Sequence, residues 1–245
     1  MFSANRSKRC NVPIYQSVKP FLKCLGGKTR LLPELINLLP KQITKYAEPF
    51  AGGTALYWWL ANNHWDELEK AVLNDSNKDF ITTYMAVRHE YSKLVDALNF
   101  LVPEYLALEQ NQRKEYYYSI RTQYNNRKIN WSTVTRATHT IFLNHTGFNG
   151  LHRVNSKGLY NTPFGRYTNP HIFDSVQLDI NYRLLQKAEI TCGDFEEIES
   201  KIDAGYLVYF DPPYRPISDT ANFASYTAEK FGDADQVRLA KCTDV

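Results

Sequence analysis

The stretch KYAEPFAGGTALYWWLAN, residues 45–62, decides the fold. Its first part, KYAEPF, is typical of a short apolar strand, and the turn AGGT leads directly into an apolar helical run. A glycine pair between a strand and a helix allows the backbone to approach a ligand closely. Gly52 and Gly53 are therefore candidate ligand-contacting positions, although a glycine pair alone is a weak signal.

The same pattern, a strand followed by a polar turn, occurs three more times. The strands are predicted at AVLN (71–74), AEITC (188–192) and LVYF (207–210), and they run into Asp75, Asp194 and Asp211. Residues 31–39 indicate a short helix with Pro33 in its first turn, and residues 81–118 a mostly helical region with a break near Pro103. Alternating strands and helices predict an α/β fold with a largely parallel sheet and a ligand crevice at the strand carboxyl ends.

The charge is unevenly distributed. Residues 113–187 contain eleven lysines and arginines but only three acids, a local charge of +8, whereas the whole chain carries +3. This basic region is also rich in aromatic residues and asparagine, which favours a polyanion as partner over a merely solvated basic face. We therefore expect an inserted second domain, mainly helices and loops, at residues 86–187, within a discontinuous domain of residues 1–85 and 188–245.

Several classes of protein are disfavoured. The first ten residues, MFSANRSKRC, lack the apolar core of a secretory signal, and no apolar run reaches the length of a membrane span. Four scattered cysteines (Cys10, Cys24, Cys192 and Cys242) have no metal-ligand spacing, so we expect reduced thiols, a cytoplasmic location and no metal.

Asp75 is the strongest candidate for nucleotide binding. It lies 23 residues beyond Gly52 at the end of the next strand, where an acid binds ribose hydroxyls in nucleotide-binding α/β folds. The alternative is that Asp75 caps the helix that follows. Neither the Walker loop nor G-x-G-x-x-G is present, which favours an adenosine without a pyrophosphate. Phe195, beside Asp194, is suited to packing on a flat ring.

These motifs, taken in order, resemble those of the DNA adenine-N6 methyltransferases, D12 class, of the Dam type. The matching stretches are PFLKCLGGK (20–28), EPFAGG (48–53), LNDSN (73–77), GDF (193–195) and DPPY (211–214). Within the basic region, FNGLHRVN (148–155) and NTPFGRY (161–167) are similar to the target-recognition region of that group. The resemblance implies a Rossmann-like methyltransferase sheet and covers residues 20–226.

The resemblance also implies roles for individual residues. The cofactor would be S-adenosylmethionine, with S-adenosylhomocysteine as product, and the target an adenine in duplex DNA, usually within GATC. The catalytic residues would be Asp211, Pro212, Pro213 and Tyr214. The cofactor would be bound by Lys23, Lys28, Phe50, Gly52, Asp75, Asp194 and Phe195. DNA would be bound by Phe148, Asn149, Leu151, Arg153, Pro163, Arg166 and Tyr167. Arg153 and Arg166 suit guanine in the major groove, with phosphate as the alternative for each.

Three positions depart from the usual pattern. Cys24 replaces a tryptophan, Thr54 stands where a second motif glycine is usual, and Phe148 replaces a tyrosine. The change at Cys24 removes an aromatic platform, and the threonine is expected to crowd the cofactor. Phe148 keeps a ring that could wedge into the base stack but lacks the hydroxyl.

The DPPY motif has a chemical rationale. The exocyclic amine of adenine is a poor nucleophile because its lone pair is delocalised into the ring. Acceptors at its two N–H bonds, the Asp211 carboxylate and the Pro212 carbonyl, would free that lone pair, while the prolines stiffen the turn. Tyr214 would stack on a base flipped out of the duplex. The alternative is that DPPY has only a structural role, as a stiff turn after a strand.

Other readings remain open from sequence. The chain reaches Val245 soon after DPPY, so we expect the later strands of the sheet to be missing. The chain would then be either an active enzyme or an inactive DNA-binding remnant of the same family. We expect a monomer. The motif also occurs in amino methylation of cytosine, and related motifs act on glutamine or RNA. A nucleotide-binding regulator without methyl transfer is the most distant alternative.

Overall fold

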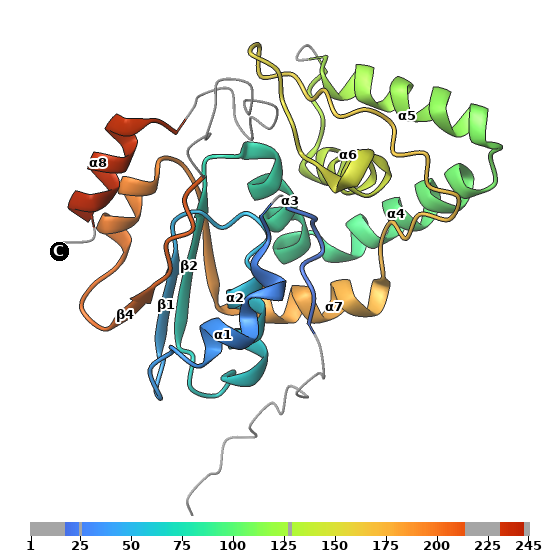
Figure 1. Ribbon diagram of the computed structural model, residues 1–245. Helices are drawn as coiled ribbons and strands as arrows, with labels where there is room; N and C mark the ends of the chain where they lie inside the picture. Colours follow the sequence, from blue (N-terminus) through green and yellow to red (C-terminus); the bar gives the residue numbers. More distant parts are fainter. Residues whose placement is uncertain (1–17, 25, 127–128, 214–230, 243–245) are drawn as a thin grey trace, which may run out of the picture.

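A four-stranded parallel sheet lies at the centre of the computed structural model, which describes residues 18–24, 26–126, 129–213 and 231–242 (Figure 1). The strand order is β3-β2-β1-β4, and all three pairings are parallel. The strands are β1 (Lys45–Glu48), β2 (Lys70–Asp75), β3 (Ala188–Cys192) and β4 (Tyr206–Val208). β1 and β2 are buried over nearly their whole length, as expected for parallel strands covered on both faces. The predicted fold class is confirmed.

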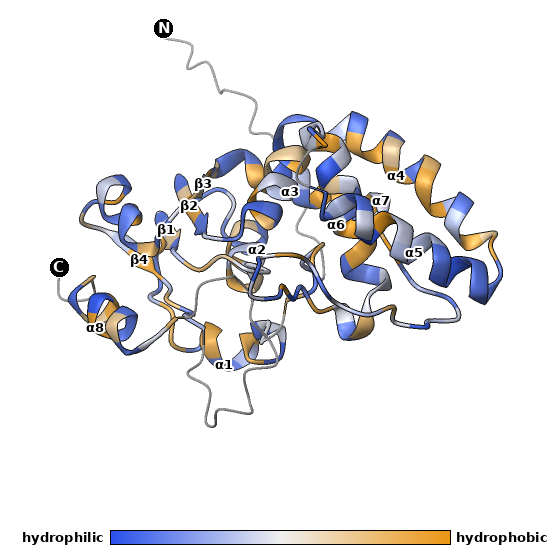
Figure 2. Ribbon diagram, turned by 90° about the horizontal axis from the view of Figure 1, so that it is seen from above, coloured by the Kyte–Doolittle hydropathy of each residue, from blue (hydrophilic) through white to orange (hydrophobic). Residues whose placement is uncertain are grey.

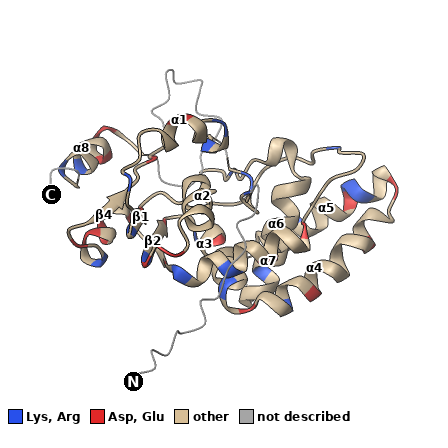
Figure 3. Cartoon of the chain, turned by 90° about the horizontal axis from the view of Figure 1, so that it is seen from below, with Lys and Arg blue, Asp and Glu red and all other residues tan. Residues whose placement is uncertain are grey.

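Helices cover the two faces of the sheet unequally. On one face lie α2 (Ala55–Asn63), α3 (Lys78–His89) and α7 (Ser175–Leu184), and α2 is buried along almost its full length. The opposite face is covered by the 3-10 segment η4 (Phe195–Lys201), where Ala47, Val72 and Ile198 form a small second core. Helix α8 (Asp233–Cys242) packs on η4 and carries charges of both signs (Figure 3).

Three further helices form most of the region inserted between β2 and β3. They are α4 (Tyr91–Leu106), α5 (Gln110–Tyr124) and α6 (Thr133–Thr146), and they lie to one side of the sheet (Figure 1). Apolar and polar residues alternate along α4 (Figure 2), and its buried side chains include Leu94, Leu98 and Leu101. The remaining elements are the short η1 (Lys28–Arg30), α1 (Leu32–Ile36), η2 (Phe148–Gly150) and η3 (Leu185–Lys187).

The expected break near Pro103 is wrong. Helix α4 continues through Pro103 to Leu106, and the interruptions lie at Glu90 and after Leu106. Pro103 lies in the last turn of α4, beside the buried Val102 and Tyr105, whose packing offsets the hydrogen bond that proline cannot make. Residue 86, where the two predicted domains divide, lies inside α3, and the division itself remains a prediction.

Residues 131–187 are rich in Asn, Gly and Pro, which favour loops, yet they contain two helices, α6 and α7. Threonines and histidines weaken the helical signal of α6, but its apolar face is buried against α3. Thr138 and Thr140 donate their hydroxyls to backbone carbonyls four residues earlier, which satisfies these groups inside the core. None of the helices in the described ranges is both long and apolar enough to cross a membrane.

Candidate active site

The carboxyl ends of β1, β2 and β4 bring three acidic side chains into one region. Glu48 ends β1, Asp75 ends β2, and Asp211 lies three residues beyond β4. The pairing of β4 with β1 extends past the strand, since the Tyr209 amide donates to the Ala47 carbonyl at 2.9 Å. This pairing brings Asp211 next to the glycine turn that follows β1. Both lie at the carboxyl edge of the sheet, where parallel sheets bind their ligands.

The glycine turn is bound to Asp75. One Asp75 oxygen accepts from the Gly52 amide at 2.7 Å, and the other accepts from the Asn77 amide at 2.8 Å. Gly52 has φ +48°, a left-handed conformation that disfavours a side chain, and an added Cβ would lie 3.1 Å from Cys24 Sγ. Thr54, with φ +49°, also adopts the left-handed region, which explains why glycine is usual at its position. Its side chain is buried beside Tyr84 rather than facing out of the turn.

Asp75 does not cap the following helix; Asn77 does, accepting from the amides of Asp79 and Phe80. The cap alternative for Asp75 is therefore wrong. Burial raises the pKa of Asp75 above its ordinary value even though the Asn77 and Gly52 amides lower it. Each of its oxygens has a second lone pair, so acceptor capacity for ribose hydroxyls remains.

Phe195 belongs to an aromatic cluster that includes Phe50. Its ring stacks on Phe50 with centroids 5.3 Å apart, and Phe231 meets the Phe50 ring edge-on at 5.7 Å. Asp194 caps η4, and its carboxylate is paired with Arg238 of α8 at 2.6 Å. The Arg238 guanidinium also lies 4.8 Å from the Phe195 ring centroid. Phe50, Asp194 and Phe195 therefore lie together, as the expected adenine-binding group requires.

Asp211 is paired with Lys28. The ammonium Nζ lies 2.5 Å from Asp211 Oδ1, and the two side chains are 12% and 25% exposed. Pro212 and Pro213 follow directly, and no peptide bond in the described ranges is cis. Tyr214, the fourth predicted catalytic residue, lies outside the described residues.

Glu48 was not among the residues predicted for the site. It is 3% exposed and accepts a hydrogen bond from the Tyr46 hydroxyl at 3.0 Å. Burial raises the pKa of Glu48 well above its ordinary value, and Asp211 and Asp75 raise it further, while Tyr46 and Lys28 act in the opposite direction. An acid within the mostly apolar run YAEPF (46–50) is the sequence signal that could have identified it.

The seven residues predicted to bind DNA lie on two paired segments, 147–154 and 160–167, the predicted recognition segments. Gly147 pairs with Phe164 and Val154 with Tyr160, both antiparallel, and the Phe148 amide donates to the Pro163 carbonyl at 2.8 Å. This arrangement places Phe148, Asn149, Leu151, Arg153, Pro163, Arg166 and Tyr167 on one pair of segments. Phe148 is 48% exposed, so its ring is accessible for the predicted insertion into a base stack.

Arg153 and Arg166 differ in how they are held. The Arg153 guanidinium donates to both the side-chain and backbone oxygens of Asn161, at 2.8 and 3.1 Å, so its orientation is fixed. Arg166 is exposed and has φ +56°. A fixed guanidinium fits a directional contact to a base edge better than an exposed one does.

Lys23 lies with the recognition segments rather than with the glycine turn. Its stem packs where a Cβ on Gly150 would stand, and its Nζ lies 5.6 Å from the Tyr167 ring centroid. Asn144 of α6, fully buried, binds the backbone of Lys23 on both sides: it accepts from the amide at 2.7 Å and donates to the carbonyl at 2.9 Å. The same amide group donates to the Gly150 carbonyl at 3.1 Å. Asn144 thus joins the 20–28 motif to the recognition segments.

A second polar link joins the start of α3 to α6 and to the predicted recognition segments. Arg136 of α6 binds Asp79 Oδ1 at 2.7 Å, and His152 lies 3.6 Å from Asp79 Oδ2. Burial acts to raise the pKa of Asp79, but His152 and Arg136 outweigh it and lower the value to about 2. The ion pair is therefore formed throughout the neutral range and fixes α6 beside the end of β2.

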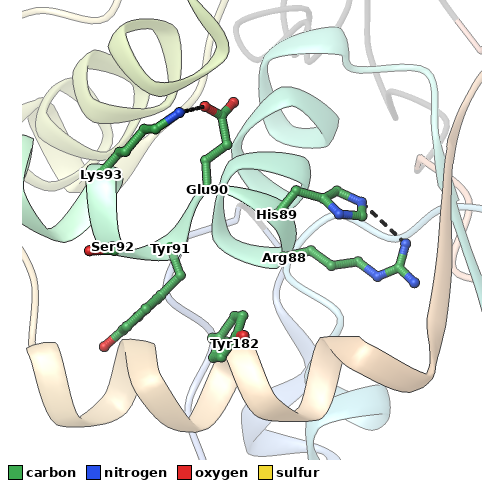
Figure 4. A pocket seen from close by; sticks show the side chains of 7 residues that line it. All are labelled: Arg88, His89, Glu90, Tyr91, Ser92, Lys93 and Tyr182. Carbon is green, nitrogen blue, oxygen red and sulfur yellow. Dashed lines mark hydrogen bonds and ion pairs between the residues drawn. The ribbon is translucent and has the colours of Figure 1, made fainter.

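A pocket elsewhere on the protein contains none of the predicted site residues. It lies between the end of α3, the start of α4 and α7, where Tyr91 stacks on Tyr182 with centroids 4.8 Å apart (Figure 4). No group of three or more His, Cys, Asp or Glu able to hold a metal ion occurs within the described ranges. The expectation that no metal is needed stays a prediction.

The parallel sheet, the glycine turn bound to Asp75 and the acids at the strand ends are typical of an α/β enzyme whose ligand crevice lies at the carboxyl edge of the sheet. The family model described as D12 class N6 adenine-specific DNA methyltransferase matches residues 25–245. The chain belongs to this family and is an adenine-specific DNA methyltransferase.

Three relatives illustrate the similarity. The type II methyltransferase M.MjaIII of Methanocaldococcus jannaschii is 44% identical over 229 residues, which cover 91% of this chain and 78% of that protein. The type II methyltransferase M1.LlaDCHI of Lactococcus lactis subsp. cremoris is 38% identical, with 92% and 76% covered. A DNA adenine methylase of Vibrio cholerae is 34% identical, with 91% and 74% covered. The family description and the name of the Vibrio relative disfavour methylation of cytosine, glutamine or RNA, and all of the names disfavour a regulator without methyl transfer.

Proposed function

We propose that this chain transfers a methyl group from S-adenosylmethionine to the N6 amine of an adenine that is flipped out of duplex DNA, within the sequence GATC. The single observation that carries the proposal is the convergence of Gly52, Asp75 and Asp211 at the carboxyl edge of one parallel sheet. S-adenosylmethionine supplies an electrophilic methyl group when it is bound. The residues of this chain bind and orient the two reactants.

Two groups of residues fit the cofactor. Asp75 offers lone pairs to ribose hydroxyls, and the left-handed Gly52 keeps side-chain atoms away from the turn. Phe50 and Phe195 provide an aromatic surface for a purine, with the Asp194 carboxylate beside it. Arg238 must share the Asp194 carboxylate with the exocyclic amine of the cofactor purine.

Asp211 is proposed to accept a hydrogen bond from one N–H of the target amine, and the Pro212 carbonyl from the other. Each acceptor must come within about 3 Å of the nitrogen. As the nitrogen forms its new bond and gains positive charge, an ionised Asp211 stabilises that charge more strongly than it stabilises the neutral amine. This difference between transition state and ground state lowers the barrier.

The recognition segments are proposed to bind the duplex, with Phe148 replacing the flipped adenine in the stack. The name of the Vibrio cholerae relative, DNA adenine methylase, supports adenine as the target base. Arg153, fixed by Asn161, is proposed to read a guanine edge. The net positive charge of residues 113–187 supports phosphate contacts that offset the cost of unstacking.

The direct test is transfer of a labelled methyl group from S-adenosylmethionine to oligonucleotide duplexes. We expect label in a duplex containing GATC and at least a hundredfold less in one where the central adenine is replaced or the flanking G·C pair is inverted. Equal labelling of both duplexes contradicts the GATC assignment. No labelling of either one, by folded protein that binds S-adenosylmethionine, supports the inactive remnant instead.

A further inference from the structure

Lys28 and Asp211 meet from positions 183 residues apart in the chain. Their 2.5 Å separation is at the short end for a charged N–H···O contact, and both groups are largely shielded from water. The resemblance assigned Lys28 to the cofactor. In the structure its ammonium instead contacts the Asp211 carboxylate, which is expected to accept a hydrogen bond from the target amine.

The position of Lys28 is fixed by the turn that precedes it. The Gly27 amide donates to the Cys24 carbonyl at 3.1 Å, and Gly26 adopts φ +76°. Lys28 Nζ also donates to the Gly26 carbonyl at 3.1 Å, so the ammonium is bound to its own turn as well as to Asp211. Two acceptors offset the roughly 2 kcal/mol of rotamer entropy that an ordered lysine loses.

The ammonium lies in a region of negative charge. Glu48 is buried at the end of β1, and Asp211 and Asp75 both act on it, while Lys28 counters them. Near neighbouring acids, a carboxylate without a cation tends to take up a proton. A protonated oxygen donates a hydrogen bond rather than accepting one, so it no longer serves an amine N–H.

We propose that Lys28 is a positioning residue that binds Asp211 Oδ1, keeps the carboxylate ionised and leaves Oδ2 to accept from the target amine. Among the residues that the structure describes, Lys28 is the only hydrogen-bond donor to the Asp211 carboxylate. This inference rests on the proposed function, because it takes Asp211 as the acceptor for that amine. Lys28 acts through Asp211 and needs no contact with cofactor or DNA.

The test compares Lys28→Met and Lys28→Arg with the unaltered protein in single-turnover methyl transfer from pH 5 to pH 9. The methionine variant is expected to be at least tenfold slower at pH 7.5. The pH below which its rate falls should rise by roughly one unit or more, because the neighbouring charge is gone. Lys28→Arg retains the charge and should keep the pH profile near that of the unaltered protein. Affinities for S-adenosylmethionine and duplex should stay within twofold.

Two controls show which group causes the shift of the pH profile in Lys28→Met. Lys41→Met changes an exposed lysine that belongs to none of the predicted sites, and it should leave the acid side of the profile in place. Glu48 also titrates near Asp211, so the comparison is repeated in a Glu48→Gln background, where a shift due to Asp211 persists. Because Lys28 is only partly buried and its neighbours Thr29 and Arg30 in η1 are exposed, the methionine variant is expected to fold, and a thermal melt checks this.

An unmoved pH profile in Lys28→Met overturns the inference, as does a loss confined to cofactor affinity. Weaker duplex binding with a shallower salt dependence also overturns it, since that identifies a phosphate contact. Asp211→Asn separates this inference from the proposed function. Full activity of that variant removes the role of Asp211, whereas an inactive Asp211→Asn with a normal Lys28→Met contradicts only the positioning role.

Discussion

Replacing Asp75 by asparagine should be costly although the two side chains have almost the same shape. Both Asp75 oxygens accept from backbone amides, at 2.7 Å from Gly52 and 2.8 Å from Asn77. Whichever way the asparagine amide turns, its NH₂ group faces one of these N–H groups. The side chain is 5% exposed, so water cannot compensate.

The magnitude follows from these contacts. One hydrogen bond to a charged acceptor is lost, about 1.5–3 kcal/mol, and one buried amide is left without a partner, about 1–3 kcal/mol. Burial of the charged Asp75 carboxylate is unfavourable, and this burial raises its pKa. Asparagine is neutral and avoids that cost, which offsets part of the lost hydrogen-bond energy. We therefore expect a net destabilisation of about 2–4 kcal/mol, or a melting point lower by roughly 5–15 °C.

The assay is urea unfolding followed by circular dichroism at pH 7.5, with Asp96→Asn as the matched control. Asp96 is exposed on α4, so the same chemical change there should stay within about 0.5 kcal/mol of the unaltered protein. Calorimetry below the melting point should also show S-adenosylmethionine binding at least tenfold weaker in Asp75→Asn. An unfolding free energy equal to that of the unaltered protein refutes the stability argument, and an unchanged affinity refutes the ribose contact.

Three other substitutions test different parts of the site. Glu48→Gln should stabilise the protein more at pH 9 than at pH 5. The folded pKa of Glu48 lies well above its ordinary 4.5, so the protonated carboxyl stabilises the folded protein at a pH below 4.5. This stabilisation is lost as the pH rises through the raised pKa, and glutamine, which stays neutral, does not lose it. Urea midpoints of the two proteins that differ equally at pH 5 and pH 9 contradict this prediction. Asn144→Ala should lower the unfolding free energy by about 2–4 kcal/mol, because three hydrogen bonds to Lys23 and Gly150 are removed from a buried position; a loss under about 1 kcal/mol is inconsistent with that role. Arg153→Ala should reduce discrimination between GATC and a duplex with one altered base by about 1–3 kcal/mol, measured as a ratio of transfer rates, and a uniform affinity loss with a shallower salt slope instead identifies a phosphate contact.

The strands could be predicted from sequence because each is an apolar run that ends at a polar turn. Asp75 and Asp211 were identified for the same reason, since an acid at the end of a buried strand stands out locally. Helix α6 could not be identified in this way, because its threonines and histidines have weak helix propensity and its stability comes from burial against α3.

The contacts within the site were beyond the sequence because they join distant residues. Lys28 pairs with Asp211 across 183 positions, and Asn144 binds Lys23 across 121. The apolar residues around Glu48 indicate burial, but no local pattern shows that Asp75 and Asp211 lie close to it. The division of the chain into two domains and its cellular location stay predictions.

The measurement that tests the central claim most directly is quantification of N6-methyladenine in a GATC duplex after a single turnover, by mass spectrometry of the digested nucleosides. The unaltered chain should convert target adenine to N6-methyladenine. Asp211→Ala should yield none above background while it still binds S-adenosylmethionine and the duplex with affinities within a fewfold of the unaltered chain. Formation of N6-methyladenine by Asp211→Ala at a near-normal rate contradicts the assignment of Asp211 as the acceptor for the target amine.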